Sequence, residues 1–281
     1  MRSRLNAGSM IPRMVAQKLI RKTAARARRE PRRRWARLWR KAGRRPPTLK
    51  LGPGVITSGE QLYQMGRLAT LEHWFALLPP QHADAALLCL RSRVALDRGS
   101  YQEAQTLADT ADLCAQDGDR PLVLLLQSRL ARAQGRYEQA ISLARHVLDC
   151  STDPAQRAMA MRALGICYDQ IGQHPEAIKQ FKAALAIERQ RGDLYAIARL
   201  HHNLGICYKL IGRFQTAEKY YSHAESYWAI LGNKGWRALT LNSKGVVQHL
   251  AGQYQAAHAT LTAALTLAHE AGPGARRDRG A

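Results

Sequence analysis

Histidine and cysteine are the residue types in this sequence that most readily bind metal ions or act in catalysis, and their spacing supports neither role. The chain has ten histidines and five cysteines. His201 and His202 are adjacent, and neighbours on a helix point about 100° apart, so these two rings cannot share a metal ion. The sequence contains no HExxH, EF-hand, GxSxG or glycine-rich phosphate-binding motif. It therefore predicts no catalytic residues, no metal site and no cofactor, and it favours a protein that is not an enzyme.

The cysteines indicate a structural role. Cys167 and Cys207 stand 40 residues apart, each directly before a tyrosine, and we expect small buried thiols at both places. Cys89, Cys114 and Cys150 are scattered and form no CxxC pair. An odd number of cysteines without a secretory signal is typical of a reducing compartment, so the sequence predicts a cytoplasmic location.

Positive charge is concentrated in residues 1–50. This stretch holds 18 of the 43 Lys and Arg residues and one acid, Glu30, which gives +17 of the formal net charge of +22. The composition predicts a basic, disordered tail. It contains no apolar run long enough to span a membrane. One part of the tail combines basic and aromatic residues, namely Arg32, Arg33, Arg34, Trp35, Arg37, Trp39 and Arg40.

These tail residues leave several interpretations open. A basic amphipathic helix here would lie on an anionic membrane or bind the phosphates of a nucleic acid. A solvated tail without a partner, a start codon assigned too early and an organelle presequence account for the same composition.

The rest of the chain is organised around a pattern that recurs every 40 residues. Two series of glycines keep this interval: Gly165, Gly205 and Gly245, and then Gly172, Gly212 and Gly252. Members of the second series stand where a helix ends in a left-handed turn, and apolar residues with helical spacing follow. Members of the first series lie inside helices, where glycine costs about 1 kcal/mol relative to alanine, and we expect a neighbouring helix to approach closely there. Each unit therefore predicts two helices joined by a tight turn.

The motif in these units resembles the tetratricopeptide repeat (TPR). Its positions are occupied in the first unit by Leu164, Gly165, Tyr168, Gly172, Ala177, Phe181 and Ala184. They are occupied in the second by Leu204, Gly205, Tyr208, Gly212, Ala217, Tyr221 and Ala224. The third unit keeps Gly245, Gly252, Ala257 and Ala264 but has Lys244 and Gln248 in place of Leu and Tyr. The resemblance implies an all-α fold, a right-handed α-solenoid of about six antiparallel helix pairs.

The repeats also predict the domain limits. Residues 57–270 form the solenoid, and its clearest repeats span 155–193, 194–233 and 234–270. Thr57 and Glu60 have the spacing of a capping box, so we expect the first helix to begin near Thr57, after a linker at 51–56. Residues 271–281 are predicted to be a disordered tail.

A second resemblance covers the more divergent repeats before residue 115. The stretches GRLATLEHWFALLPP and ALLCLRSRVALDRGSYQEAQTLAD are similar to the TPR sensor region of MalT-like, LuxR-type bacterial transcription regulators. In those proteins a nucleotide-binding domain precedes the repeats and a helix-turn-helix follows them. This sequence has no GxxxxGK[ST] loop, and PGARRDRGA follows Gly272. The resemblance implies a stand-alone relative, or a fragment, of such a regulator, acting in bacterial signalling or transcriptional regulation.

Resemblance to other tetratricopeptide proteins implies where a partner binds. The concave groove is lined by the first helix of each pair, and the corresponding residues are Arg162, Asp169, Arg199, His202, Asn203, Lys209, Asn242 and His249. Asn203 matches an asparagine that binds the main chain of an extended peptide in related long repeats, because an amide both donates and accepts. Arg199 and Lys209 suit a carboxylate, and the same positive lining is expected to include Arg93, Arg129 and Arg132. These residue types are also ordinary on solvated helices.

The sequence therefore predicts a non-enzymatic scaffold that binds a protein or peptide in its groove. The alternative is a nucleic-acid or anionic-membrane binder that uses its basic tail while the repeats recruit a partner. The last helix pair, with Leu261 and Leu265, is followed by no polar capping helix. Self-association through this edge, or truncation of a longer protein, is a further expectation.

Overall fold

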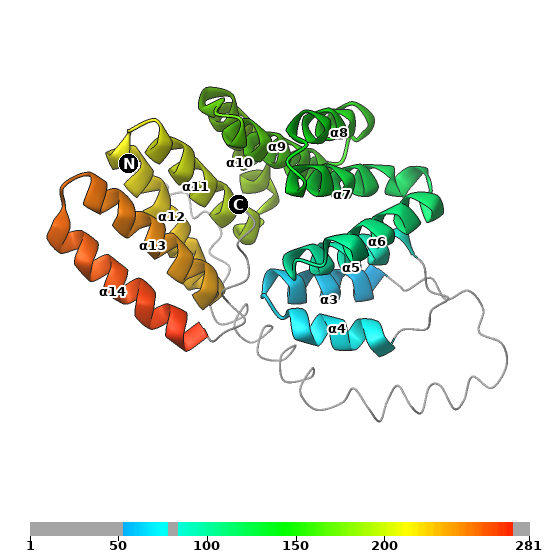
Figure 1. Ribbon diagram of the computed structural model, residues 1–281, viewed down its shortest axis with the longest axis horizontal. Coiled ribbons are helices and arrows are strands. Elements are labelled where there is room, and N and C mark those ends of the chain that lie inside the picture. The colour runs from blue at the N-terminus through cyan, green and yellow to red at the C-terminus, as the bar shows by residue number, and fades with distance from the viewer. Residues whose placement is uncertain (1–52, 78–83, 272–281) are drawn as a thin grey trace, which may run out of the picture. The chain divides into compact units, whose positions relative to one another are not determined.

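The computed structural model describes residues 53–77 and 84–271, which form twelve α-helices in six antiparallel pairs (Figure 1). The first three pairs are α3 (Pro53–Gln64) with α4 (Leu68–Leu77), α5 (Ala85–Asp97) with α6 (Tyr101–Cys114), and α7 (Arg120–Ala133) with α8 (Tyr137–Cys150). The last three are α9 (Pro154–Gln170) with α10 (His174–Arg191), α11 (Leu194–Leu210) with α12 (Phe214–Leu231), and α13 (Lys234–Leu250) with α14 (Tyr254–Ala271). A short 3-10 helix, η1 (Asp117–Asp119), precedes α7. The predicted all-α solenoid of helix pairs is confirmed.

In each of the last three helix pairs, a glycine in the left-handed conformation lies in the turn between the two helices. Gly172, Gly212 and Gly252 have φ angles of 78°, 74° and 76°. Nothing lies within 4 Å of the place where a Cβ atom would stand at any of them. Backbone conformation, rather than lack of space, is therefore the reason for glycine at these turns.

Inside the first helices, lack of space explains why the residue is glycine. A Cβ atom on Gly165 would stand 2.5 Å from the ring of Phe181, and one on Gly205 would stand 2.6 Å from the ring of Tyr221. Gly245 faces a leucine side chain of α14 in the same way, at 2.6 Å. The close approach expected from the sequence is confirmed, because each second helix places a large side chain directly against a bare backbone.

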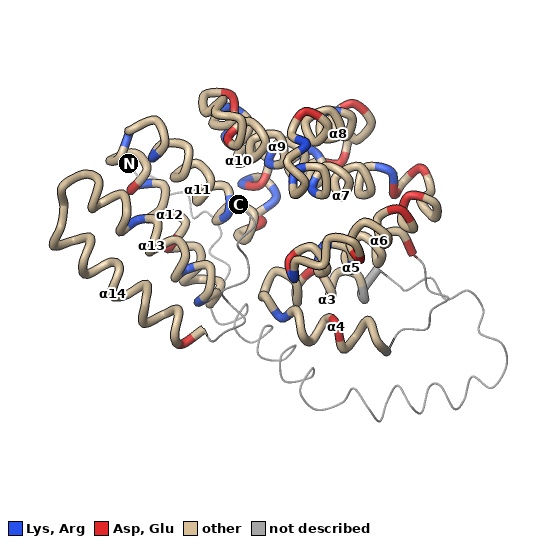
Figure 2. Tube along the Cα trace, in the orientation of Figure 1, with Lys and Arg blue, Asp and Glu red and all other residues tan. Residues whose placement is uncertain are grey.

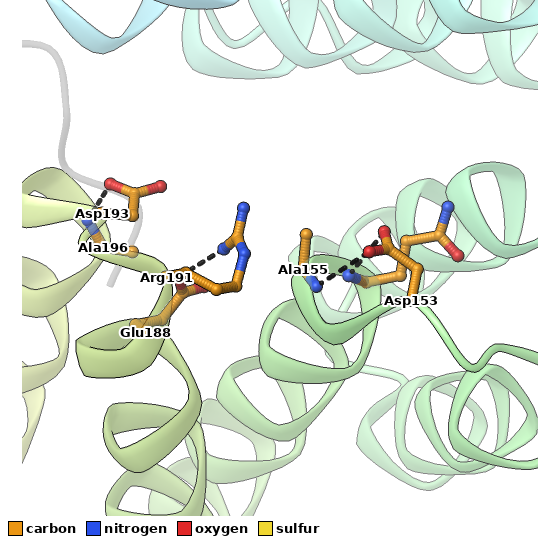
Figure 3. Close-up of polar contacts among 7 residues, drawn as sticks. Asp153, Ala155, Glu188, Arg191, Asp193 and Ala196 are labelled. Atoms are coloured by element: carbon orange, nitrogen blue, oxygen red, sulfur yellow. Dashed lines mark hydrogen bonds and ion pairs between the residues drawn. The ribbon is translucent and has the colours of Figure 1, made fainter.

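Aspartate side chains fix the starts of α9 and α11, which carry most of the predicted groove residues. Asp153 accepts hydrogen bonds from the backbone N–H groups of Ala155 and Gln156, at 3.2 and 3.3 Å (Figure 3). Asp193 accepts one from the backbone N–H of Ala196 at 3.0 Å. Such caps satisfy N–H groups that the first turn leaves unpaired, and each stabilises its helix by about 1 kcal/mol.

The start of the first helix differs from the prediction. α3 begins at Pro53, within the predicted linker, so Thr57 lies inside the helix and the predicted capping box is wrong. Proline is accepted in a first helical turn because that turn leaves its N–H groups without helical partners. The carboxylate of Glu60 instead forms an ion pair with Arg93 of α5. The predicted tail at 1–50 lies outside the described residues, as does all of 271–281 except Ala271.

First and second helices form two layers. Successive first helices contact one another along the stack, from α3 and α5 to α11 and α13. Successive second helices of the described residues approach one another less closely, so the stack curves toward the first helices and these form its concave layer. Cys167 and Cys207 are buried between the layers, as the sequence predicts. None of the described helices is both long and apolar enough to cross a membrane.

The last described helix carries few charged residues and exposes two large apolar side chains. α14 buries Ala257 and Ala264, whereas Tyr254 and Leu265 remain 66% and 61% exposed. Glu270 is the one acidic residue of this helix, and the helix contains no Lys or Arg (Figure 2). Self-association through this helix stays a prediction.

Candidate functional site: a cationic pocket on the first helices

A small pocket of about 50 Å³ brings together four of the predicted groove residues, Asp169, Arg199, His202 and Asn203. Arg199, His202 and Asn203 of α11 line it, together with residues of α9, α10 and α13. The other lining residues are Ile166, Asp169, Gln170, Phe181, Ile206, Trp236 and Leu239. The pocket thus joins polar groups to apolar walls, and most of its lining comes from three successive first helices.

Aromatic rings hold the guanidinium of Arg199. Its Cζ atom lies 5.1 Å from the centre of the Trp236 ring and 5.9 Å from that of Tyr195. Trp236 in turn stacks on the buried Trp228, with ring centres 5.3 Å apart and planes inclined by 18°. Cation–π attraction of this kind orients the guanidinium and leaves N–H groups at its edge for a ligand. The sequence reasoning missed both rings, although Tyr195 stands four residues before Arg199 and so on the same helix face.

Asn203 contributes a donor that the described residues leave unused. Its Nδ2 atom is buried and has no hydrogen-bond partner among residues 53–77 and 84–271. A buried polar group without a partner costs about 1–3 kcal/mol. A carbonyl acceptor supplied by a ligand would remove that cost, which fits the role predicted for this residue.

His202 is a predicted groove residue whose ring already has a partner within the protein. His202 is 5% exposed, and its Nδ1 atom lies 3.1 Å from the Thr240 hydroxyl of α13. Burial, followed by the charges of Arg199 and Lys209, lowers the pKa of His202 to about 4, so the ring is neutral at neutral pH.

Asp169 also reaches the pocket but is already bonded. Its Oδ1 atom accepts a hydrogen bond from the Cys207 thiol at 3.2 Å and lies 3.0 Å from Nδ1 of His174. Burial, followed by the negative charge of Asp169, raises the pKa of Cys207 above the ordinary range. The thiol therefore stays protonated and acts as the donor.

The remaining four predicted residues, Arg162, Lys209, Asn242 and His249, lie outside the pocket lining. Lys209 is half-buried in the last turn of α11, and Asn242 and His249 are exposed on α13. The His249 ring packs against Tyr254, with ring centres 5.3 Å apart. The tail residues Arg32, Arg33, Arg34, Trp35, Arg37, Trp39 and Arg40 lie outside the described residues.

Arginines of the N-terminal first helices are neutralised by their own neighbours. Arg93 pairs with Glu60 and lies over the Tyr63 ring, 4.2 Å from its centre. Arg129 pairs with Asp97 and donates to the Tyr63 hydroxyl at 2.9 Å, while that hydroxyl donates to Asp97 at 2.5 Å. Contrary to the expectation from the sequence, Arg93 and Arg129 do not extend a free positive lining.

Three further arginines have no carboxylate partner among the residues that the structure describes. Arg132, Arg162 and Arg199 come from the neighbouring helices α7, α9 and α11, and none forms an ion pair within the described residues. Burial, followed by the charges of Arg199, Arg129 and Arg132, holds the pKa of Arg162 well below its usual value. Burial and then Arg129 lower the pKa of Arg132. We call Arg132, Arg162 and Arg199 the arginine cluster; basic positions on their helices can be followed in Figure 2.

Glu188 is a carboxylate that feels the charge of Arg162. It is buried at the end of α10 and forms an ion pair with Arg191 (Figure 3). Burial raises the pKa of Glu188, while Arg191 opposes the rise. Glu188 forms its ion pair with Arg191, and no ion pair joins it to Arg162 among the described residues.

The tetratricopeptide repeat profile matches residues 119–190 and 196–270, which together make up more than half of the chain. The chain belongs to the tetratricopeptide repeat family. Solved structures of low sequence identity share the fold of this tetratricopeptide repeat protein. BtubC (BKLC) from P. vanneervenii superposes with a TM-score of 0.57 at 18% identity, over 76% of this chain and 90% of that one.

Two Rap proteins share the tetratricopeptide fold as well. The apo form of RapI has a TM-score of 0.57 at 14% identity, over 66% of this chain and 70% of that one. A Rap protein complexed with competence and sporulation factor has a TM-score of 0.61 at 16% identity, over 72% and 58%. These similarities show the fold alone. No curated protein matches the chain, and the resemblance to MalT-like regulators stays a prediction.

Proposed function

We propose that this tetratricopeptide repeat protein is a non-enzymatic scaffold that binds an extended segment of a partner protein or peptide along its first helices. The observation that carries the proposal is the pocket, where Asn203 presents an unused donor beside the oriented guanidinium of Arg199. Such a pair suits a peptide, because the amide binds the main chain and the guanidinium a side chain or terminus.

The setting that we propose is bacterial signalling or transcriptional regulation in the cytoplasm. Support comes from the resemblance of the first repeats to MalT-like sensor regions. A second line of support is the fold shared with a Rap protein that is complexed with competence and sporulation factor.

A capture experiment with variants of the full chain tests the proposal. We expect wild type to retain a partner from a lysate of its own cells, and the Arg199→Ala/Asn203→Ala variant to lose it. The matched control is Arg189→Gln/Lys219→Gln, which removes two charges from exposed positions on the second helices α10 and α12 and should retain the partner. Equal retention by all three proteins would refute binding at the pocket.

The alternative function, binding of nucleic acid or an anionic membrane through the tail, is favoured by the +17 charge of residues 1–50. It predicts binding to RNA, DNA or anionic vesicles that weakens steeply with salt. Replacing Arg32, Arg33, Arg34, Arg37 and Arg40 by glutamine should then abolish binding, whereas the pocket variant should bind normally. Loss of binding in the pocket variant instead would count against the tail.

A further inference from the structure

The turns inside the last three helix pairs carry large apolar side chains that the core does not use. Leu210 and Leu250, at the ends of α11 and α13, are 51% and 52% exposed. The α11–α12 and α13–α14 turns lie on the same side of the stack (Figure 1), as equivalent turns of stacked pairs do. The exposed apolar residues of these turns, which we call the turn rim, are Ile171, Leu210, Ile211, Leu250 and Tyr254.

Earlier pairs have polar residues where the turn rim is apolar. The residue directly before the turn glycine is Arg98 in the second pair and Gln134 in the third, and both are exposed. Arg98 forms ion pairs with two glutamates. The turn therefore folds without an apolar side chain at this position, so core packing does not explain Ile171 and Ile211. Exposed apolar side chains that recur on one edge mark an interaction surface.

Basic groups beside the turn rim have no acidic partner. Lys209, Arg213 and Lys219 form no ion pair among the residues that the structure describes. The acids near these turns each contact another side chain of the chain instead, namely Asp169, Glu176 and Glu218. Free positive charge thus accompanies the apolar residues.

The helices that begin at the turn rim lack negative caps. Gln173 and Arg213 stand at the cap positions of α10 and α12, and neither side chain accepts a hydrogen bond from its helix. At the opposite edge Asp153 and Asp193 cap α9 and α11. The positive ends of the α10 and α12 dipoles therefore face the rim side without a carboxylate, and side chains of their first turns lean the same way. This arrangement favours an anionic surface.

The projecting form of the turn rim suits a flat partner. We propose that the turn rim is a membrane-binding edge, whose apolar side chains enter an anionic bilayer while Arg213 and Lys219 contact lipid phosphates. A bilayer reaches the tips of several hairpins at once, whereas a protein partner would need a groove of matching shape. Leucine and isoleucine at the tips, with tyrosine and basic residues just behind them, match the boundary between acyl chains and headgroups. The inference does not depend on peptide binding at the pocket.

Flotation of the full chain with lipid vesicles tests the inference. The vesicles contain phosphatidylcholine alone or with an equal part of phosphatidylglycerol, and every protein carries glutamine at the five tail arginines of 32–40, so that the tail does not contribute. We expect this chain to float with the anionic vesicles, and Leu210→Gln/Leu250→Gln to bind at least about tenfold more weakly. The matched control is Leu113→Gln/Ile230→Gln, which changes two exposed apolar residues near the ends of α6 and α12, at the opposite edge, and should bind normally.

Charge and position give two further readouts. Arg213→Gln/Lys219→Gln should weaken binding to the anionic vesicles by about fivefold for each charge removed. In hydrogen exchange with vesicles present, amides at 169–174, 209–214 and 249–254 should gain protection, and those at 97–101 and 133–137 should not.

Several results would overturn the inference. They are an absence of flotation once the tail arginines are replaced, an equal loss of binding in the control, and protection confined to the other edge. Loss of flotation in the pocket variant Arg199→Ala/Asn203→Ala would also overturn it. If Leu210 and Leu250 were needed to retain a soluble protein while no variant floated, the turn rim would bind a protein and the membrane assignment would fail.

Discussion

The second and third helix pairs fill the core differently from the last three. At the position of Gly165, seven residues before the turn glycine, these earlier pairs carry Ser92 and Ser128. Both serines are buried, and their hydroxyls donate to the carbonyls of Ala104 and Ala140 at 2.7 and 2.8 Å.

The residue opposite that position changes in step. Ala108 and Ala144 of the earlier pairs stand where α10 has Phe181. The earlier pairs therefore combine serine with alanine at these two positions, whereas the fourth pair combines glycine with phenylalanine, and both combinations give a packed core. The effect of this glycine on stability therefore depends on which residue the second helix places opposite it.

The two regions differ in their charges too. Arg93 and Arg129 of the earlier pairs are bonded to acids and to Tyr63, whereas Arg162 and Arg199 of the later pairs have no acid partner among the described residues. These differences in core packing and in charge pairing can be tested one substitution at a time.

Replacing Gly165 of the later region by serine should cause the largest loss of stability. Gly165→Ser puts a Cβ atom 2.5 Å from the Phe181 ring, and overpacking of this kind costs about 3 kcal/mol. Urea unfolding followed by circular dichroism measures the loss. The double variant Gly165→Ser/Phe181→Ala recreates the earlier pairing and should be less destabilised than the sum of its single variants by about 2 kcal/mol. If the two single losses of free energy simply added up in the double variant, the residues at positions 165 and 181 would not be coupled, and the comparison would fail.

Removal of an acid from the earlier region should come next. Asp97→Ala leaves Arg129 half-buried without its carboxylate, and we expect a loss of about 2–3 kcal/mol in unfolding free energy. Arg129→Met in the same chain should restore part of it. The corresponding change in the later region, Arg162→Gln, should not destabilise at all. If urea unfolding showed similar losses of unfolding free energy for both variants, charge pairing would not distinguish the two regions.

Acid should weaken the later region before the earlier one. Burial is the main cause that lowers the pKa of both His201 and His202 from 6.5 to about 4. The unfolded chain therefore binds protons first, so stability is complete above pH 6.5 and is lost as pH falls toward 4. At pH 5 the loss is about 2 kcal/mol for each ring.

Hydrogen exchange read by mass spectrometry locates this effect. Amides of α11 to α13 should lose protection between pH 6.5 and 4.5 before those of α5 to α8 do. In the variant His201→Phe/His202→Gln this order should vanish. A pH profile that is unchanged in that variant would assign the acid sensitivity to other groups.

The smallest effect is expected at the serine of the earlier region. Ser128→Ala removes one buried hydrogen bond to a carbonyl that helix α8 also uses, and it should cost about 1 kcal/mol. Ser128→Gly should cost about 1 kcal/mol more, because no ring fills the space and glycine is a poorer helix former. Thermal unfolding of both variants measures this; no change in either would show that the hydroxyl is dispensable.

The spacing of residues in the sequence correctly predicted structural features that lie within one helix pair. The turn glycines and the close approach of a neighbouring helix at Gly165 were both predicted from the sequence, because each involves residues a short distance apart. The same reasoning failed at Thr57, where a proline starts the helix and Glu60 is drawn to Arg93 of the next pair.

Contacts between pairs could not be predicted in this way. His202 fits a groove position by spacing, but Thr240 and Trp236 of the following pair cover it. Asp169 is held by the Cys207 thiol, 38 residues later. Whether an arginine is paired depends on its neighbours in the adjacent pairs, so Arg129 and Arg162 look alike in the sequence and differ in the structure.

The two solutions of the core position carry a consequence for how such a chain grows. Ser128 bonds to the Ala140 carbonyl in the second helix of its own hairpin, and Gly165 packs against Phe181 in the second helix of its own. A gene duplication that copies a whole hairpin therefore inherits a matched set and folds at once. A recombination joint inside a hairpin would set serine against phenylalanine, or glycine against alanine, so lineages of these repeats are expected to exchange hairpins as indivisible units.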